Sequence, residues 1–176
     1  MNDSDLRSHI RTIPDFPRKG IMFRDITTLL AHPGAFLRAV DAMAGLFEGT
    51  EVTKVVGIES RGFIFASAIA YKLNAGLVPV RKPKKLPAPA LREEYTLEYG
   101  SDALEIHADA IARGERVLLV DDLLATGGTI GAACKLVERT GGIIAGIAFL
   151  IELDFLHGRD RLKNYSVHSV IHYQEE

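Results

Sequence analysis

The segment Val117-Leu118-Leu119-Val120-Asp121-Asp122-Leu123-Leu124-Ala125-Thr126-Gly127-Gly128-Thr129 decides the fold of this chain. Its first four residues are apolar, the composition of a buried strand. Two aspartates, a loop with two glycines and a helix follow. The helix presents one apolar face, formed by Ile130, Ala133, Cys134 and Val137. The segment therefore predicts a strand, a loop and a helix in succession, which is the repeating unit of an α/β sheet.

The same alternation recurs on both sides of this segment. Compact apolar runs predict strands at 54–58, 76–80, 116–120, 143–151 and 166–173. One helix is predicted from Pro33, and another, capped by Ser60, runs to about Leu73. Because strands and helices alternate, the fold class is α/β, with a mostly parallel twisted sheet flanked by helices and right-handed crossovers.

Less regular structure is expected elsewhere. A short helix from Asp3 or Ser4 to about Ile10 precedes a segment, up to 21–23, that is mostly loop. Three prolines make 82–91 an exposed loop, since proline holds neither a helix nor a central strand. Alternating residues between Tyr95 and Ala108 favour a hairpin, with Arg113-Gly114 as a turn.

Length and composition limit the function classes. A chain of 176 residues suits one domain spanning 1–176. The formal net charge of −2 argues against a nucleic-acid or membrane-surface binder, which needs a large positive surface. The longest apolar run is too short to span a bilayer, the N-terminus lacks a signal-peptide layout, and Cys134 stands alone. We therefore expect a cytoplasmic protein.

The glycine-containing loop predicts a site for a sugar phosphate. Small residues at the mouth of a helix leave N–H groups and the positive end of the helix dipole free for a phosphate. The carboxylates of Asp121 and Asp122 would repel that phosphate, but they can accept hydrogen bonds from the two hydroxyls of a ribose. The alternative is an ordinary loop in which acids solvate a strand end and glycines shape a turn. A Walker loop is excluded because no Gly-Lys-Ser/Thr follows the glycines.

The hydrophobic-Asp-Asp-x-x-x-Thr-Gly-Gly-Thr pattern resembles the signature of the phosphoribosyltransferase family. Further segments are similar to the adenine-specific members of that family along nearly the whole chain. They are Pro14-Asp15-Phe16-Pro17, Phe23-Arg24-Asp25-Ile26, Glu59-Ser60-Arg61-Gly62-Phe63, Arg81-Lys82 with Lys85-Leu86-Pro87, and Tyr95-Thr96-Leu97-Glu98-Tyr99-Gly100. The resemblance implies a type I core with a small base-binding hood, made of roughly 1–32 and parts of the C-terminal region.

The resemblance also implies a reaction and the residues for it. A 5-phosphoribosyl group would pass from phosphoribosyl pyrophosphate to adenine, giving AMP and pyrophosphate in purine salvage. Glu98 is the counterpart of the catalytic acid/base, and Arg61, next to the pyrophosphate, would be the second catalytic residue. The phosphoribosyl-binding residues would be Asp121, Asp122, Ala125, Thr126, Gly127, Gly128 and Thr129. The pyrophosphate-binding residues would be Glu59, Ser60, Arg61, Arg81, Lys82 and Lys85.

The base and the metal are assigned in the same way. Phe23 would stack on adenine, the backbone of Met22 and the side chain of Arg24 would contact its edge, and Leu153 would close the other side. Mg²⁺ is expected to be held mainly by the substrate pyrophosphate, without direct protein ligands. The segment 84–89 would form a lid, and a homodimer would complete each pyrophosphate site, with the basic loop supplied by either subunit.

Each assignment has a structural alternative. Arg61 can be a surface cation, the 81–85 cations a solvated charge run, Glu98 an outward strand residue, and Phe23 and Leu153 ordinary core. Two other functions stay open. A 6-oxopurine phosphoribosyltransferase would donate rather than accept a hydrogen bond at position 6 of the base. A non-catalytic phosphoribosyl pyrophosphate sensor would keep the sugar-phosphate cradle without turnover.

Overall fold

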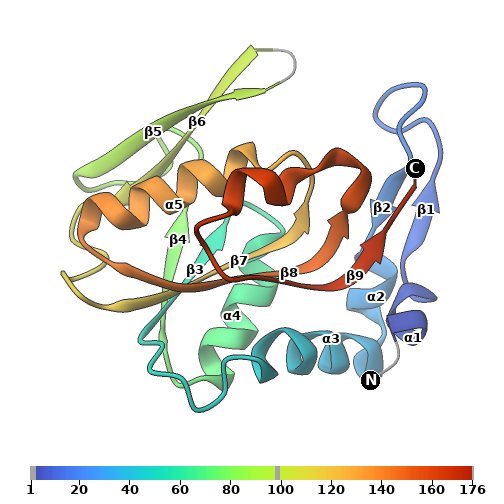
Figure 1. Cartoon of the computed structure of the whole chain (residues 1–176), viewed down its shortest axis with the longest axis horizontal. Coiled ribbons are helices and arrows are strands. Elements are labelled where there is room, and N and C mark those ends of the chain that lie inside the picture. Colours follow the sequence, from blue (N-terminus) through green and yellow to red (C-terminus); the bar gives the residue numbers. More distant parts are fainter. Residues whose placement is uncertain (1–2, 98–99, 176) are drawn as a thin grey trace.

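A five-stranded parallel sheet forms the centre of the protein (Figure 1). The computed structural model describes residues 3–97 and 100–175. The strand order is β4-β3-β7-β8-β9. The bounds are β3 Lys54–Ile58, β4 Gly76–Val80, β7 Arg116–Leu124, β8 Ile143–Leu153 and β9 Val167–Tyr173. Because all five strands run the same way, their carboxyl ends meet at one edge, where ligands bind in such sheets.

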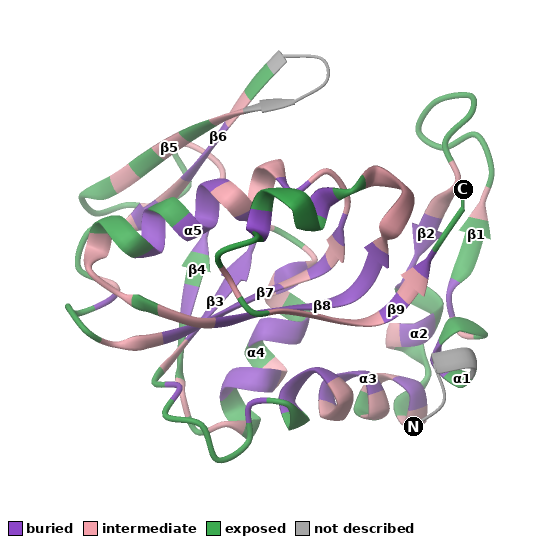
Figure 2. Ribbon diagram, in the orientation of Figure 1, coloured by how far each residue is buried: buried purple, intermediate pink, exposed green. Residues whose placement is uncertain are grey.

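Helices cover both faces of the sheet, and the hydrophobic core divides accordingly into two layers. Helices α3 (Pro33–Gly45) and α4 (Gly62–Lys72) pack on one face, and α5 (Gly128–Thr140) packs on the other. The central strands β3, β7 and β8 are mostly buried, whereas three of the five residues of edge strand β4 are exposed (Figure 2). The apolar runs of these central strands are therefore continuous because core residues cover both of their faces.

Two antiparallel pairs lie outside the main sheet. Strands β1 (Arg11–Ile13) and β2 (Phe23–Asp25) pair with each other and stand beside β9, near the short helices α1 (Asp3–Arg7) and α2 (Thr27–Ala31). Strands β5 (Ala90–Leu97) and β6 (Gly100–His107) form a hairpin that packs on α5. Between β8 and β9 lie two 3₁₀ helices, η1 (Asp154–Leu156) and η2 (Gly158–Leu162).

The predicted α/β class and the mostly parallel sheet are confirmed. Strands 54–58 and 76–80 have the predicted bounds. Of the predicted loop 82–91, residues 82–89 are free of helix and strand, but Ala90 and Leu91 begin β5 because they pair with β6. Strands β7 and β8 continue beyond the predicted ends, to Leu124 and Leu153, because they pair with each other there. Among the described residues, no helix is long and apolar enough to cross a membrane.

Three expectations near the N-terminus and α4 need correction. The supposed loop up to 21–23 contains strand β1, which pairs with β2. Helix α2 was not predicted, since its five residues are too few to show an apolar period. Ser60 does not cap α4, because the helix begins at Gly62 and Arg61 precedes it.

Candidate functional site

A small cavity lies at the mouth of α5, directly after β7. Its volume is about 80 Å³, and its lining residues are Asp121, Leu123, Leu124, Ala125, Thr126, Gly127, Gly128, Thr129 and Ile130. Six of the seven residues predicted to bind the phosphoribosyl group line this cavity, and the exception is Asp122. The helix begins at Gly128, so its unpaired N–H groups open toward the loop. The arrangement is that of an anion site at a helix N-terminus.

Gly127 is required for a reason that differs from the predicted one. Its φ of +79° lies in the left-handed region, which favours glycine. A Cβ on Gly127 would also lie 2.5 Å from the carbonyl oxygen of Gly158. The loop backbone therefore packs against the segment after β8, whereas the sequence suggested only that the glycine leaves room for the anion.

The two adjacent carboxyl groups differ in their contacts. The backbone N–H of Asp122 donates to Asp121 Oδ1 at 2.9 Å. Asp122 is 5% exposed, and its Oδ2 lies 2.8 Å from Arg61 Nε in an ion pair whose geometry is not that of a hydrogen bond. Burial and the neighbouring charge of Asp122 raise the pKa of Asp121 well above its ordinary value. Burial also raises the pKa of Asp122, which the Arg61 guanidinium opposes.

Arg61 connects the sugar end of the site to an aromatic pair from the N-terminal segment. Its guanidinium carbon lies 5.2 Å from the centre of the Phe23 ring. Phe16 meets the same ring edge-on, with centroids 5.1 Å apart, and is 50% exposed. Phe23 therefore lies next to the carboxyl ends of β3 and β7, as a base-stacking residue must, and does not belong to the hydrophobic core.

Arg24 lies on the opposite side of β2 from Phe23. Its guanidinium stacks on the Tyr173 ring at 4.0 Å, its Nη1 donates to Thr12 Oγ1 at 2.6 Å, and the residue is 8% exposed. Its side chain thus fastens β2 to β1 and β9, and only its backbone shares the Phe23 side. Leu153 ends β8 and is partly buried against the core.

The cations that follow β4 are held by acids. Glu59 accepts hydrogen bonds from Arg81 Nε and Nη2, both at 3.3 Å, and from the Lys82 N–H at 2.8 Å. Although burial alone would raise the pKa of Glu59, the Lys82 N–H and the Arg81 guanidinium lower it below its ordinary value. Glu59 therefore stays ionised and acts here as the anchor of Arg81.

The remaining predicted residues are only partly brought to the site. Lys82 Nζ bonds to Tyr95 and Asp102 of the β5–β6 hairpin, so its charge is directed away from Glu59. Lys85 is exposed, and its carbonyl oxygen accepts from Arg81 Nη1 at 3.4 Å. Ser60 is exposed beside Arg61, Met22 precedes β2, and Glu98 lies outside the described residues.

Among the described residues, one group offers the geometry of a metal site. Ligand atoms of Glu152, Asp154 and His172 lie within 4.8 Å of one another. Both oxygens of Glu152 already accept hydrogen bonds from Arg159, at 2.9 and 2.5 Å. Because a bound cation would have to displace a paired guanidinium, this group is an ion-pair network.

Sequence reasoning missed Phe16, Gly158 and the pair formed by Glu152 and Arg159. Glu152 gave a signal, since it is a charge inside the otherwise apolar run of β8, and a buried charge needs a partner. The partner Arg159 lies in a polar bend without a pattern of its own. Phe16 belongs to a segment that is similar to the phosphoribosyltransferase family, but nothing in the sequence indicated a role for its side chain.

The chain is similar to known proteins along nearly its whole length. A model of the phosphoribosyl transferase domain matches residues 25–173. The chain is 58% identical over 175 residues to the adenine phosphoribosyltransferase of Acidobacterium capsulatum, covering 99% of this chain and 97% of that protein. It is also 58% identical over 168 residues to the enzyme of that name from Clostridium perfringens, covering 96% and 98%.

Solved structures show the same likeness. The crystal structure of adenine phosphoribosyltransferase from Thermoanaerobacter pseudethanolicus superimposes with a TM-score of 0.95 at 51% identity, covering 98% of this chain and all of that one. The Saccharomyces cerevisiae enzyme, complexed with an imino-altritol bisphosphate and adenine, gives a TM-score of 0.91 at 39% identity, covering 96% and 98%. The chain therefore belongs to the phosphoribosyltransferase family, in its adenine phosphoribosyltransferase branch.

Proposed function

We propose that this chain transfers the 5-phosphoribosyl group of phosphoribosyl pyrophosphate to adenine, giving AMP and pyrophosphate. The observation that carries the proposal is the joint position of three groups at one sheet edge. Two acidic residues lie at the end of β7, the mouth of α5 follows directly, and Arg61 bridges from Asp122 to the Phe23 ring. The two acidic residues match a ribose, the mouth of α5 matches its 5′-phosphate, and the Phe23 ring matches a planar base.

The phosphoribosyl group is bound by the loop after β7. The N–H groups from Ala125 to Thr129 hold the 5′-phosphate in the cavity at the mouth of α5. Asp121 and Asp122 accept hydrogen bonds from the ribose hydroxyls. When Asp122 accepts from the sugar, Arg61 is released from its ion pair and can face the pyrophosphate.

Adenine stacks on the Phe23 ring, and the backbone of Met22 and Arg24 reads its edge. The Arg24 side chain supports this edge indirectly by holding β2 against β1 and β9. Leu153, at the end of β8, covers the other side of the purine. The choice of adenine as the base is supported by the yeast relative, which is solved with adenine bound.

Arg81 and Lys85, with Ser60 and Arg61, neutralise the pyrophosphate, and Glu59 orients Arg81 for this task. Lys82 reaches the anion only after leaving its partners on the hairpin. Mg²⁺ would be held mainly by the pyrophosphate oxygens of the substrate, with the carboxyl groups at the end of β7 nearby, and it would lower the charge of the leaving group. The protein supplies no separate cage, since the Glu152 group is occupied by Arg159.

In the reaction a purine ring nitrogen forms a bond to C1 of the ribose while the bond from C1 to pyrophosphate breaks. The departing oxygen keeps the bonding electron pair. Glu98 takes the proton that the purine nitrogen loses, as a general base. The fixed charges around the sugar stabilise the oxocarbenium-like state between the two bonds.

The proposal is tested with radiolabelled adenine and phosphoribosyl pyrophosphate. We expect labelled AMP with Mg²⁺ and none after chelation with EDTA. Glu98→Gln should lower kcat about a hundredfold or more with little change in KM, the signature of a lost proton transfer. Competition with hypoxanthine, guanine and xanthine separates the base classes. Preferred turnover of guanine would assign the chain to the 6-oxopurine enzymes, and binding without turnover would make it a sensor.

A homodimer in the cytoplasm completes the proposal. Exposed apolar side chains gather on one side of the sheet edge: Ile64 and Tyr71 lie two turns apart on α4, and Leu77 lies on edge strand β4. Contact between two copies would cover this patch and bring the loop after β4 toward the partner's site. The free thiol of Cys134 suits a reducing compartment.

A further inference from the structure

The two 3₁₀ helices after β8 lie directly behind the phosphate-binding loop. A Cβ on Gly158, the first residue of η2, would lie 2.0 Å from the carbonyl oxygen of Ala125 and 3.1 Å from the N of Gly127. A Cβ on Gly127 would in turn meet Gly158. Two glycine backbones therefore touch without side chains between them, and any shift of η2 must move the loop.

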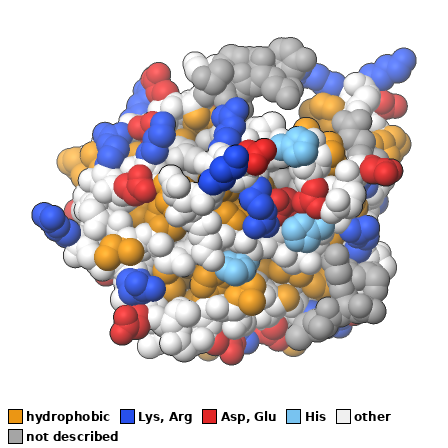
Figure 3. Space-filling view, in the orientation of Figure 1, with side chains coloured by type: hydrophobic (Ala, Val, Ile, Leu, Met, Phe, Trp, Pro, Cys, Tyr) orange, Lys and Arg blue, Asp and Glu red, His pale blue; other side chains and the backbone are white. Residues whose placement is uncertain are grey.

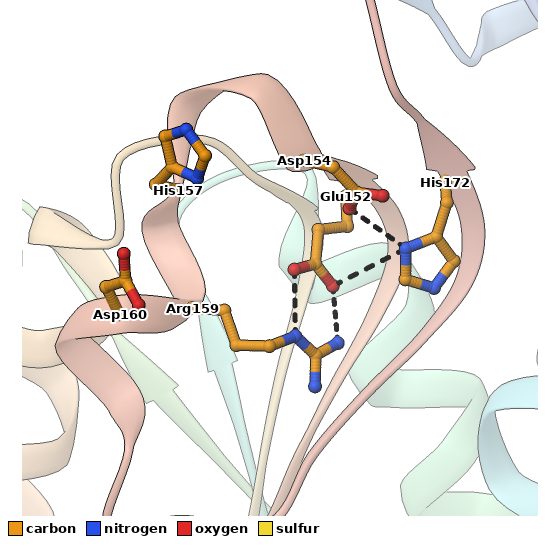
Figure 4. A pocket seen from close by; sticks show the side chains of 6 residues that line it. All are labelled: Glu152, Asp154, His157, Arg159, Asp160 and His172. Carbon is orange, nitrogen blue, oxygen red and sulfur yellow. Dashed lines mark hydrogen bonds and ion pairs between the residues drawn. The ribbon is translucent and has the colours of Figure 1, made fainter.

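An ion pair between the buried Glu152 and the exposed Arg159 fastens η2 to the sheet (Figure 4). Arg159 Nε donates to Glu152 Oε1 at 2.9 Å, and Nη2 donates to Oε2 at 2.5 Å. Arg159 Nη1 reaches the carbonyl oxygen of Val167 at 2.8 Å, and Ser169 Oγ donates to Glu152 at 2.6 Å. The segment is thus held to both β8 and β9, one residue from Gly158.

The pair is fixed because Glu152 is only 4% exposed and cannot be left without a partner. Burial alone would raise the pKa of Glu152, but the bonds from Arg159 and Ser169 lower it, so the carboxyl group stays ionised. The planar guanidinium meets both carboxylate oxygens at once, which sets direction as well as distance.

Next to this pair, the chain forms a hollow of about 350 Å³ lined by Glu152, Asp154, His157, Arg159, Asp160 and His172 (Figure 4). His172 Nδ1 lies 3.0 Å from Asp154 Oδ1, which ties η1 to β9 as well. On the face shown in Figure 3, acidic, basic and histidine side chains lie next to one another in the same region. The charged side chains around this hollow therefore pair with one another, as Arg159 does with Glu152 and His172 with Asp154.

We propose that Glu152 and Arg159 are positioning residues for phosphoribosyl transfer, because their ion pair holds Gly158 against the loop that binds the 5′-phosphate. Glu152 also precedes Leu153, so the same pair links the phosphate end of the site to the base end. The identity of the phosphate ligand rests on the proposed function, but the mechanical link between η2 and the loop does not.

The link is tested first in the ligand-free protein by hydrogen–deuterium exchange. In Arg159→Gln the N–H groups of 125–129 should exchange about tenfold faster than in the wild type, while those of β3 stay unchanged. The matched control is Lys163→Gln, which removes an exposed ion pair between Asp160 of η2 and the residue that directly follows this helix, and which should leave the loop unchanged. Unchanged exchange in Arg159→Gln would overturn the inference whatever the activity.

Kinetics provide the second readout. Arg159→Gln should raise the KM for phosphoribosyl pyrophosphate about tenfold, with kcat and the KM for adenine within about threefold, since a displaced loop loses ground-state binding. Arg159→Lys should recover part of this loss. The double variant Glu152→Gln/Arg159→Gln should be no worse than either single variant, because both changes break one pair.

Gly158→Ala provides a variant that keeps both charges. Its added methyl group collides with Ala125, so the KM for phosphoribosyl pyrophosphate should rise at least as much as in Arg159→Gln. If these variants instead lowered kcat and raised both KM values by similar factors, and also lowered the unfolding temperature, the ion pair would serve only stability. That result would overturn the proposal. A wild type without AMP synthesis, but with a loop that loosens in Arg159→Gln, would refute the proposed function alone.

Discussion

Asp121 combines a high pKa with a position against the start of α4, where a Cβ on Gly62 would lie 2.7 Å from its Oδ1. In the folded chain burial and Asp122 favour its protonated form, whereas in the unfolded chain it ionises near its ordinary pKa. Between these two pKa values the folded state binds more protons, so stability falls as pH rises through that window. Ionising Asp121 in the folded chain therefore costs free energy, and this charge opposes folding above its ordinary pKa.

Asp121→Asn removes that charge and keeps an oxygen for the Asp122 N–H. We expect an unfolding temperature higher by about 2–4 °C at pH 7, with a gain that vanishes below about pH 4. Affinity for phosphoribosyl pyrophosphate should fall about tenfold, because the carboxyl group proposed to accept from the ribose hydroxyls is replaced by an amide. Calorimetry measures both. Asp109→Asn, an exposed control, should change neither, and a destabilised Asp121→Asn at pH 7 would contradict the assigned charge.

The Phe23 ring gives the second prediction at this scale. Phe23→Ala should raise the KM for adenine about tenfold with a smaller change in kcat, since base–aromatic stacking stabilises by about 1–3 kcal/mol. Phe16→Ala removes the ring that touches only the edge of Phe23 and should have less effect. Steady-state kinetics at saturating phosphoribosyl pyrophosphate decide the question. An unchanged KM for adenine would show that the Phe23 ring has only a structural role.

At the residue scale, the sequence located the loop that lines the cavity at the mouth of α5, but it did not explain how that loop packs. Asp121 and the 125–129 loop were predictable because adjacent acids and glycines at a helix start have few other uses. The contact of Gly127 with Gly158 joins positions 31 residues apart and left no local pattern. The direction of the Arg24 side chain was equally hidden, since it depends on Tyr173 at the far end of the chain.

Among the elements, the β1–β2 pair has a strong polar support. Asp25 accepts from Arg11 Nε at 3.1 Å and from the Thr27 N–H at 2.9 Å, bonds that lower its pKa to about 2. A carboxyl group with a lowered folded-state pKa stabilises the fold above its unfolded pKa of 3.8, and this stabilisation is lost as pH falls toward 2.

Asp25→Asn should therefore lower the unfolding temperature by about 2–4 °C at pH 7, and the difference from wild type should narrow as pH falls from 4 to 3. Thermal unfolding followed by circular dichroism over this range checks it. Asp41→Asn is the matched control, because its ion pair with Lys72 is exposed and contributes little. A difference that is constant with pH would show that Asp25 acts through shape alone.

Elements that show a local apolar pattern in the sequence were predictable. Strand segments that exist only because they pair with a distant strand were not. Strands β3 and β4 followed from compact apolar runs with clear ends. The last residues of β7 are polar or lie in the site, and only their pairing with β8 makes them strand. Strand β1 has three residues, of which two are exposed, so nothing but its partner β2 identifies it.

For the whole molecule, the patch on α4 and β4 gives a prediction about assembly. Tyr71 is 91% exposed, and a glutamate there would place a charge in the proposed contact between two copies. We expect the wild type to sediment as a dimer and Tyr71→Glu as a monomer with reduced activity. Leu37→Glu, on the exposed side of α3 and outside the patch, should remain dimeric. A monomeric wild type would refute the dimer.

The interior of the molecule has one more consequence, for labelling. Cys134 is the single cysteine of the chain, it is 1% exposed inside α5, and burial raises the pKa of its thiol to about 12. Such a thiol stays protonated and shielded from alkylating reagents at neutral pH. A second cysteine introduced at Glu94, on β5, would therefore accept a fluorophore selectively and report how the hairpin moves during turnover, without any change to the native sequence elsewhere.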